Sequence, residues 1–308
     1  MEATFRIVLL LMVVAASAEE NRCSCPTNKR TNCAEEQGIC VCKALGSNQK
    51  VDCSTLTSKC LLMKAEASAP GGKSFTTPET GFLDNDGLYD PDCENSGIFK
   101  ARQCNYTDTC WCVNSAGVRR TDKSDKDIRC SELVRTNWIF IQLKHQEPET
   151  PFSQSEVASS LRHLIQNRYR LRPIFISSIE YNHPFIKIDL KQNASQKSDG
   201  DVDIADVAYY FEKDIKRVSP FASNNKFNIT VNGETLDIEQ VLIYYVDEIP
   251  PEFTMQFVKA GVVAVAVVLL AAILIGIIVF VVMRRWRTGK YEKVELKEMG
   301  EMQINRVS

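Results

Sequence analysis

The chain has 308 residues, room for two or three modules of ordinary size, and carries a formal net charge of −2 at pH 7. All 12 cysteines lie between Cys23 and Cys130, whereas residues 131–308 contain none. A reducing cytosol leaves thiols unpaired, so this even and clustered set indicates an oxidising compartment and disulfide bonds. The part of the chain before the C-terminal tail is acidic, which argues against nucleic acid or heparin as a partner.

The N-terminus has the features of a secretory signal. An apolar stretch runs from Ile7 to Ala16, and Ala16 and Ala18 have the spacing of a signal-peptidase site. Because the stretch is too short to span a bilayer, we predict a signal peptide over residues 1–18 rather than an uncleaved anchor.

A cysteine-rich segment follows the signal. It holds seven cysteines between Cys23 and Cys60 and no apolar run long enough to form a core. Disulfides must therefore stabilise a small module, which we place at residues 19–59. Zinc is the competing use of clustered cysteines, but zinc sites usually space their cysteines about two to four residues apart and need thiolates, which are scarce in a secreted chain.

A second cysteine-rich module extends over residues 60–130. Its segment DNDGLYDPDC contains four acidic residues that resemble calcium ligands: Asp84, Asp86, Asp90 and Asp92. Gly87 comes too early for a calcium loop of about twelve residues, and no terminal glutamate follows. An acidic turn is therefore the favoured interpretation.

The stretch CWC is the most informative part of this second module. Residues two apart in an extended segment face the same way, so Cys110 and Cys112 lie opposite Trp111 and take different disulfide partners. We expect the ring of Trp111 to supply apolar cover that a small, disulfide-stapled module otherwise lacks.

Residues 131–247 contain no cysteine and are long enough to be held together by burial. Their pattern predicts an α+β domain with an antiparallel sheet and helices on one face. The expected elements are, in chain order, a strand over 138–143, a helix opened by a capping box at Ser153–Glu156, paired strands over 175–180 and 185–190, a helix starting near Asp203, a hairpin turn at Asn232–Gly233 and a buried strand over 241–246.

This third domain shows no catalytic pattern. His145, His163 and His183 lie in different elements, and neither G-x-S-x-G nor H-E-x-x-H occurs. The acidic run over 199–206 is better explained by helix capping than by a metal cluster. We therefore predict no enzymatic activity, no metal and no cofactor. Three sequons mark outward-facing surface wherever they carry glycan: Asn105, Asn193 and Asn228.

A membrane segment follows the third domain. A stem over residues 248–259 leads to 24 uncharged residues, 260–283, which are enough for a bilayer span with some tilt. Arginines follow directly, so the positive-inside bias places the tail, residues 284–308, in the cytoplasm. The chain is thus predicted to be a type I single-pass membrane protein, and a buried core helix is the alternative.

Two features of the membrane part predict contacts. The span has small residues four apart, Ala272 and Gly276, which allow close packing against a partner helix. A basic cluster opens the tail and suits the anionic inner leaflet of the plasma membrane: Arg284, Arg285, Arg287 and Lys290. Ordinary membrane-helix composition and a simple topology signal are the respective alternatives.

The second module resembles the thyroglobulin type-1 module, because QC at 103–104, CWCV at 110–113, Gly117 and Cys130 occur in that order. Over its full length, the chain resembles the family of the epithelial cell adhesion molecule and the trophoblast cell-surface antigen. The stretches that carry this resemblance are VDCSTLTSKCLLMKAE, NDGLYDPDC, CWCVNSAGVRRTDK, SQKSDGDVDIADVAYYFEKDIK, LIYYVDEIPPEF and GKYEKVELKEMGEM.

The resemblance implies a disulfide pattern for the second module, namely Cys60–Cys93, Cys104–Cys110 and Cys112–Cys130. The remaining six cysteines then pair among themselves: Cys23, Cys25, Cys33, Cys40, Cys42 and Cys53. It also implies a homophilic epithelial adhesion and signalling glycoprotein that forms cis dimers at lateral plasma membranes and cell junctions. Association with claudins, and shedding by a sheddase followed by intramembrane cleavage that releases the tail, are further implications of the resemblance.

Two other functions stay open at this point. Some thyroglobulin type-1 modules inhibit cysteine proteases by inserting loops into the cleft, and the segment between Cys60 and Cys93 is long enough to do so. The ectodomain is otherwise a candidate receptor for a soluble ligand, which self-association of the chain would distinguish.

Overall fold

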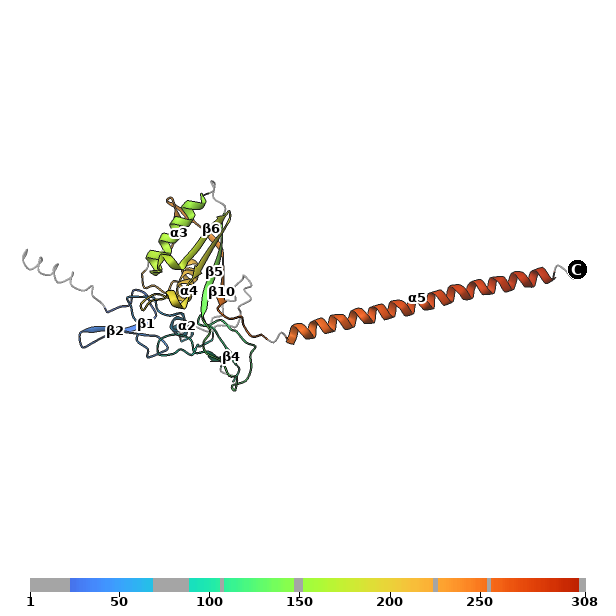
Figure 1. Cartoon of the computed structure of the whole chain (residues 1–308), viewed down its shortest axis with the longest axis horizontal. Coiled ribbons are helices and arrows are strands. Elements are labelled where there is room, and N and C mark those ends of the chain that lie inside the picture. The colour runs from blue at the N-terminus through green and yellow to red at the C-terminus, as the bar shows by residue number, and fades with distance from the viewer. Residues whose placement is uncertain are drawn as a thin grey trace, which may run out of the picture. The chain divides into compact units, whose positions relative to one another are not determined.

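The computed structural model describes residues 23–68, 89–105, 108–146, 152–223, 227–253 and 256–304. The expected signal peptide, together with Asp84 and Asp86, lies outside these ranges. The chain divides into two compact units, Met1–Phe253 and Thr254–Ser308, which we describe separately (Figure 1).

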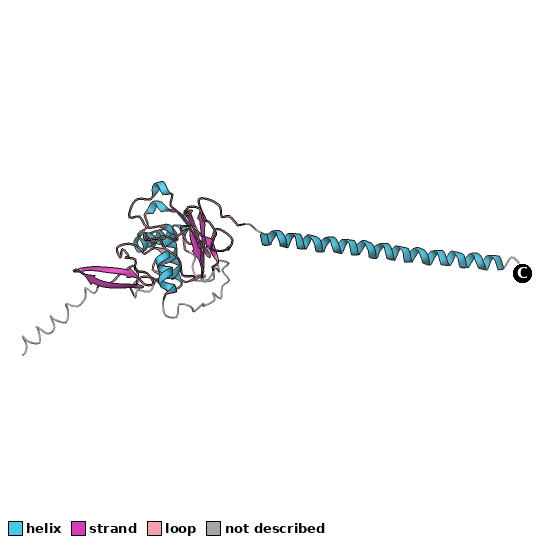
Figure 2. Cartoon of the chain, turned by 90° about the horizontal axis from the view of Figure 1, so that it is seen from below, coloured by secondary structure: helices cyan, strands magenta, loops and turns pink. Residues whose placement is uncertain are grey.

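The N-terminal module is built on a β-hairpin. Strands β1 (Thr31–Glu36) and β2 (Ile39–Ala44) pair antiparallel, and Gln37 and Gly38 both take positive φ in the tight turn between them (Figure 2). Most side chains of the hairpin are exposed or only half-buried, so burial alone does not hold it.

In the described part of the second module there are one helix and one short strand pair. Its elements are α2 (Lys59–Ala67), β3 (Arg102–Cys104) and β4 (Cys110–Cys112). Trp111 is 2% exposed and packs edge-on against Tyr89, with ring centroids 5.2 Å apart. It shares a buried cluster with Leu61, Phe99 and Val113, which confirms the packing role expected for this tryptophan.

The third domain is α+β, as predicted. Its main sheet is antiparallel with the strand order β10-β5-β7-β6, and the strands are β5 (Thr136–His145), β6 (Ile176–Asn182), β7 (Phe185–Lys191) and β10 (Ile238–Asp247). The hairpin expected at Asn232–Gly233 is present, but its strands β8 (Ile229–Val231) and β9 (Glu234–Leu236) form a separate two-stranded sheet.

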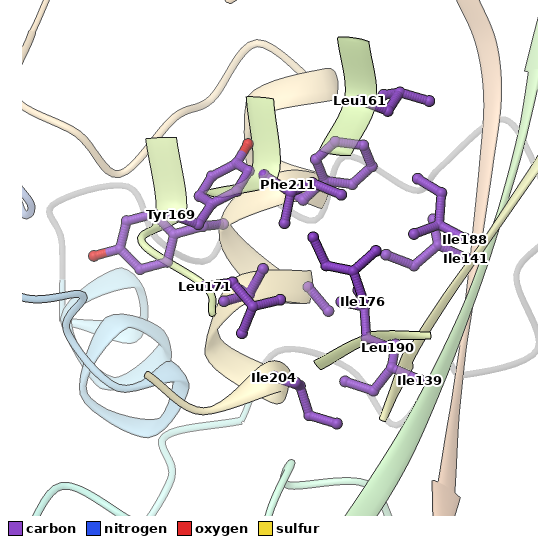
Figure 3. Packing of buried hydrophobic residues seen from close by; sticks show 14 of the residues in the cluster. Ile139, Ile141, Leu161, Tyr169, Leu171, Ile176, Ile188, Leu190, Ile204 and Phe211 are labelled. Atoms are coloured by element: carbon purple, nitrogen blue, oxygen red, sulfur yellow. The ribbon is translucent and has the colours of Figure 1, made fainter. Parts of the chain in front are cut away.

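Helices α3 (Gln154–Tyr169) and α4 (Ile204–Ile215) pack on one face of the main sheet (Figure 1). The predicted capping box opens α3. The Ser153 hydroxyl accepts a hydrogen bond from the backbone N–H of Glu156, and the Glu156 carboxylate accepts one from the backbone N–H of Ser153. The 3-10 helices η1 (Pro173–Phe175) and η2 (Ala194–Gln196) lie in the connections. Apolar side chains from both helices and the sheet form one core, seen in Figure 3 around Ile141, Leu161 and Phe211.

Strand β10 differs from its prediction. It was expected to be buried over residues 241–246, but only Val241 is buried there, while Tyr244 and Val246 are 52% and 37% exposed. The reason is that β10 is an edge strand and the helices cover only one face of the sheet. Its continuous apolar run therefore includes residues on an uncovered face.

Helix α4 is buried more completely than its amphipathic pattern predicts. Its expected inner face, which includes Val207 and Phe211, meets the sheet core, but Ala205 and Tyr210 are also buried. The Tyr210 hydroxyl donates to the Thr27 carbonyl oxygen at 2.7 Å, so the N-terminal module covers the second side of the helix. Sequence periodicity does not reveal this inter-module contact.

The C-terminal unit contains the helix α5 (Gln256–Ile304), of which side chains are described for residues 261–285. Among the described helices, α5 alone has a segment long and apolar enough to cross a membrane, Gly261–Arg285. At the rise of an α-helix these 25 residues extend about 37 Å, which exceeds a hydrocarbon core of about 30 Å.

Candidate interaction surfaces

The 12 cysteines form six disulfides and none is free. The N-terminal module contains Cys23–Cys40, Cys25–Cys53 and Cys33–Cys42, and the second module contains Cys60–Cys93, Cys104–Cys110 and Cys112–Cys130. Cys110 and Cys112 thus have different partners, on either side of Trp111. The sulfurs of Cys23, Cys40 and Cys42 lie within 4.8 Å of one another, but as disulfide sulfurs they are not thiolate ligands for zinc.

The face of the main sheet that points away from α3 and α4 is apolar over β5 and β10. We call this the outer sheet face and define it by five side chains: Trp138, Phe140, Leu242, Tyr244 and Val246. Phe140 and Tyr244 are cross-strand neighbours with ring centroids 5.9 Å apart. No described helix packs on these five residues, and each is at least partly exposed.

Polar and charged side chains surround the outer sheet face. The Trp138 indole N–H donates to Asp189 at 2.7 Å, and the Lys191 ammonium lies 4.6 Å from the centre of the Trp138 ring. An apolar centre within a polar surround is the arrangement of a protein–protein interface. Sequence reasoning missed this surface, although the run LIYYV in β10, with no charge over five residues, was the available signal.

Three modules meet around Glu66 of α2. Its carboxylate is paired at 2.7 Å with Arg30 of the N-terminal module and at 2.7 Å with Lys213 of α4. Asp206 of α4 accepts a 2.6 Å hydrogen bond from the backbone N–H of Lys59 at the start of α2. Burial, and then the neighbouring carboxylate of Asp203, raises the pKa of Asp206 to about 7.

The first residues of the expected stem contact the second module. Arg120, 5% exposed, donates to Asp247 at 2.9 Å and to the carbonyl oxygens of Ile249 and Pro250 at 2.7 and 2.8 Å. The backbone N–H of Glu252 donates to the Arg120 carbonyl oxygen at 2.8 Å. Residues 248–253, which we call the strap, are therefore held against the second module.

Two of the three histidines come together, which sequence reasoning did not anticipate. His145, 1% exposed, has its Nε2 3.2 Å from the Tyr181 hydroxyl, and that hydroxyl is 3.2 Å from Nδ1 of His183. The Nδ1 atom of His145 lies against the carbonyl oxygen of Gln146 at 2.5 Å, so Nδ1 carries the proton and Nε2 accepts from Tyr181. This chain of hydrogen bonds ties the strand ends together.

The remaining predicted residues are placed as follows. Asp90 pairs with Lys64 and Asp92 with Lys100, each at 2.9 Å, in keeping with an acidic turn. The sequon asparagines Asn105, Asn193 and Asn228 are exposed. Ala272, Gly276, Arg284 and Arg285 are exposed on α5, whereas Arg287 and Lys290 lie on α5 with side chains outside the description.

Three family profiles match the chain. They are described as the N-terminal domain of the epithelial cell adhesion molecule over residues 23–59, the thyroglobulin type-1 repeat over 73–130 and the C-terminal domain of EPCAM/Trop-2 over 136–247. Their order agrees with the predicted small disulfide-rich module, thyroglobulin type-1 module and α+β domain.

Full-length relatives give the same result. Human tumor-associated calcium signal transducer 2 is 52% identical over 305 residues, covering 96% of this chain and 94% of the relative. The epithelial cell adhesion molecules of human and mouse are 52% and 50% identical over 302 residues, each covering 97% of this chain and 96% of the relative. These names describe an adhesion molecule and a signal transducer, and neither is the name of an enzyme. The chain belongs to the EpCAM/Trop-2 family.

Proposed function

We propose that this chain is a homophilic epithelial cell–cell adhesion and signalling glycoprotein, anchored in the plasma membrane by α5, whose ectodomain self-associates through the outer sheet face. The observation that carries this proposal is an apolar surface on two adjacent strands that no described helix covers. Family membership supports a second copy of the chain as the occupant of this surface.

The composition of the outer sheet face favours self-association over a charged ligand. Tyrosine, tryptophan and phenylalanine are enriched at interface centres because they bury a large area with few rotatable bonds. At the end of β10, the buried carboxylate of Asp247 is paired with Arg120 of the second module and so presents no unmatched charge there. A partner that buries Tyr244 and Val246 removes apolar area from water without breaking existing ion pairs.

The test introduces a charge on the exposed part of this surface. Tyr244→Lys and Val246→Lys are expected to reduce energy transfer between full-length copies in cells at least about tenfold, because an unpaired buried charge costs several kcal/mol. Both side chains are exposed, so the substitutions leave the fold intact. Glu180→Lys, an exposed position on the opposite edge strand β6, is the matched control.

Wild-type energy transfer in Tyr244→Lys would exclude the outer sheet face as the contact. Cell aggregation between populations that carry the same variant separates contacts on one membrane from contacts between membranes. Loss of energy transfer with normal aggregation assigns the face to cis dimers, and loss of both assigns it to adhesion as a whole.

Signalling and further partners form a second part of the proposal. The resemblance supports location at lateral membranes and junctions, claudin association, and release of the tail by a sheddase and an intramembrane protease. The small residues Ala272 and Gly276, one helical turn apart, support a lateral partner in the membrane. The basic start of the tail supports contact with anionic lipid, which binding of a tail peptide to anionic but not neutral vesicles tests.

A further inference from the structure

A hollow with a mixed polar and apolar lining lies between helix α3 and the hairpin strand β8. It has a volume of about 470 Å³ and is lined by Ser159, Ser160, His163 and Leu164 of the helix and by Thr230 of the strand. This volume falls in the range of roughly 300–1,000 Å³ that is usual for small-molecule sites. Neither the disulfide framework nor the outer sheet face involves these residues.

Strand β8 and the segment before it run antiparallel to α3. Asn232, directly after β8, lies near the Glu156 carboxylate in the first turn of α3, and the pKa of that group is lowered first by Ser153 and to a smaller extent by Asn232. At the other end, the Arg168 guanidinium lies 5.1 Å from the centre of the Phe227 ring. Asn228 falls between these two contacts, and the register therefore places it beside the second half of α3.

Asn228 and Thr230 face the same side of this segment. Ile229 and Val231 are 2% and 0% exposed and point into the core, so the alternate residues point outward. Asn228 and Thr230 are both exposed. Because Thr230 lines the hollow, the Asn228 side chain leaves the protein at the edge of the same hollow.

Asn228, Ile229 and Thr230 form an N-glycosylation sequon in a chain whose six disulfides indicate the secretory pathway. We infer that the hollow is a binding site for the chain's own glycan, and that it holds the first N-acetylglucosamine units attached to Asn228. The inference does not depend on self-association, because the hollow and the outer sheet face have no residue in common.

The lining matches the chemistry of an N-acetylated sugar. The hydroxyls of Ser159 and Ser160 and the imidazole of His163 supply hydrogen-bond partners for sugar hydroxyls and the acetamido group. The amide nitrogen of Asn167 lies 3.0 Å from the His163 ring and so orients it at the rim. Leu164 is half-buried and offers an apolar patch to a C–H face of the ring.

The experiment measures enzymatic glycan release from the full-length chain, expressed in secretory cells and kept native in detergent. Site-specific release is followed by mass spectrometry at Asn228 and at Asn193, an exposed sequon residue that precedes η2 and serves as the internal reference. A glycan that is docked about nine-tenths of the time is released about tenfold more slowly, because release follows the undocked population.

We expect about tenfold slower release at Asn228 than at Asn193 in the native chain, and equal rates after denaturation and reduction. His163→Ala combined with Asn167→Ala should remove the difference, whereas His183→Ala, another exposed histidine, should not. Equal native rates at the two sites, or an Asn228 that carries no glycan in cells that modify Asn193, would overturn the inference.

A second measurement does not use the glycan-releasing enzyme, so it is independent of any effect of the substitutions on that enzyme. Asn228→Gln removes the attachment site of the docked glycan, and Asn193→Gln removes the reference glycan. Amide hydrogen exchange over residues 159–167 should rise several-fold in Asn228→Gln and stay at the wild-type rate in Asn193→Gln. Identical exchange in all three chains would show that the sugar does not contact α3.

Discussion

The carboxylate of Asp206 accepts a 2.6 Å hydrogen bond from the backbone N–H of Lys59, a residue 147 positions earlier and in a different module. Ser58, the N-cap residue of α2, makes no capping hydrogen bond with its side chain and donates instead to the Gly97 carbonyl oxygen at 2.6 Å. The third domain thus supplies the side-chain cap that the second module's helix lacks.

Burial of the Asp206 carboxyl group at this contact makes the inter-module joint dependent on pH. The pKa of Asp206 is raised from 3.8 to about 7, first by burial and then by Asp203. A carboxyl group with a raised folded-state pKa contributes stability that is fully present below a pH of about 4 and is lost as the pH rises through about 7. We expect Asp206→Asn, which does not titrate, to remove this component from the stability of the full-length chain.

The measurement is thermal unfolding between pH 4.5 and 8 in detergent. The wild-type chain should lose about 1–3 kcal/mol more than Asp206→Asn over this interval, a range reduced from the full linkage value because the residue is partly exposed. Asp201→Asn, on the loop before α4, is the matched control and should keep the wild-type slope. The same slope in Asp206→Asn and wild type would contradict the expectation.

The buried pair Arg120–Asp247 connects the second module to the third domain and to the strap. Their side chains are 6% and 7% exposed, and Asp247 also accepts from Asn114 at 2.8 Å and Thr136 at 2.9 Å. Arg120→Leu leaves a buried carboxylate without its cation and should cost about 3–5 kcal/mol. Chemical denaturation measures this loss, and Arg120→Leu combined with Asp247→Leu should recover part of it.

The same arginine controls access to the strap. Arg120→Lys keeps a positive charge but cannot reach Asp247 and both carbonyl oxygens at once, because an ammonium lacks the planar fork of a guanidinium. We expect limited proteolysis within residues 248–253 to become at least about tenfold faster in Arg120→Lys. Arg129→Lys, at an exposed arginine of the second module, is the control, and equal cleavage in both variants would show that Arg120 does not protect the strap.

The membrane span yields a prediction about lateral contacts. Ala272 and Gly276 lie one turn apart, and bulky residues such as Ile273 and Ile277 flank them. Gly276→Leu should weaken recovery of a claudin or of a second copy without changing surface expression, because it fills the point of closest approach. Val267→Leu, on the opposite side of the helix from Gly276, is the control for added volume. If co-precipitation and membrane energy transfer are unchanged in Gly276→Leu, the span acts only as a membrane anchor.

The elements of the third domain were largely predictable, because they depend on local signals. The capping box at Ser153, the turn at Asn232–Gly233 and the alternation in β7 each specify a local conformation. The strand order and the uncovered face of β10 were not predictable, because an apolar run has the same composition whether it is buried on both faces or forms a surface.

The candidate surfaces were harder to predict from the sequence than the helices and strands. Contacts such as Glu66 with Lys213 and Arg120 with Asp247 join residues more than one hundred positions apart. Charged residues of this kind appear in a sequence as ordinary solvated positions, and only the fold shows that they are buried and paired. The hollow beside Asn228 likewise depends on the register between α3 and β8, which no local pattern encodes.

Adjacent leucines in α2 provide the last prediction, because they enter different cores. Leu61 packs in the cluster of Trp111, whereas Leu62 packs with the core beneath the main sheet. Trp111→Ala, expected to cost about 3–5 kcal/mol, should therefore raise hydrogen exchange over residues 89–130 while residues 136–247 stay protected.

Leu62→Ala should cost about 2–5 kcal/mol and loosen the sheet as well as α2, and Leu61→Ala is its matched control within the same helix turn. Exchange measured by mass spectrometry on the full-length chain separates the two patterns. Equal loss of protection in both regions for Trp111→Ala would mean that the joint at Asp206 and Glu66 makes the ectodomain unfold as one unit, since α2 then transmits the loss of either core to the other.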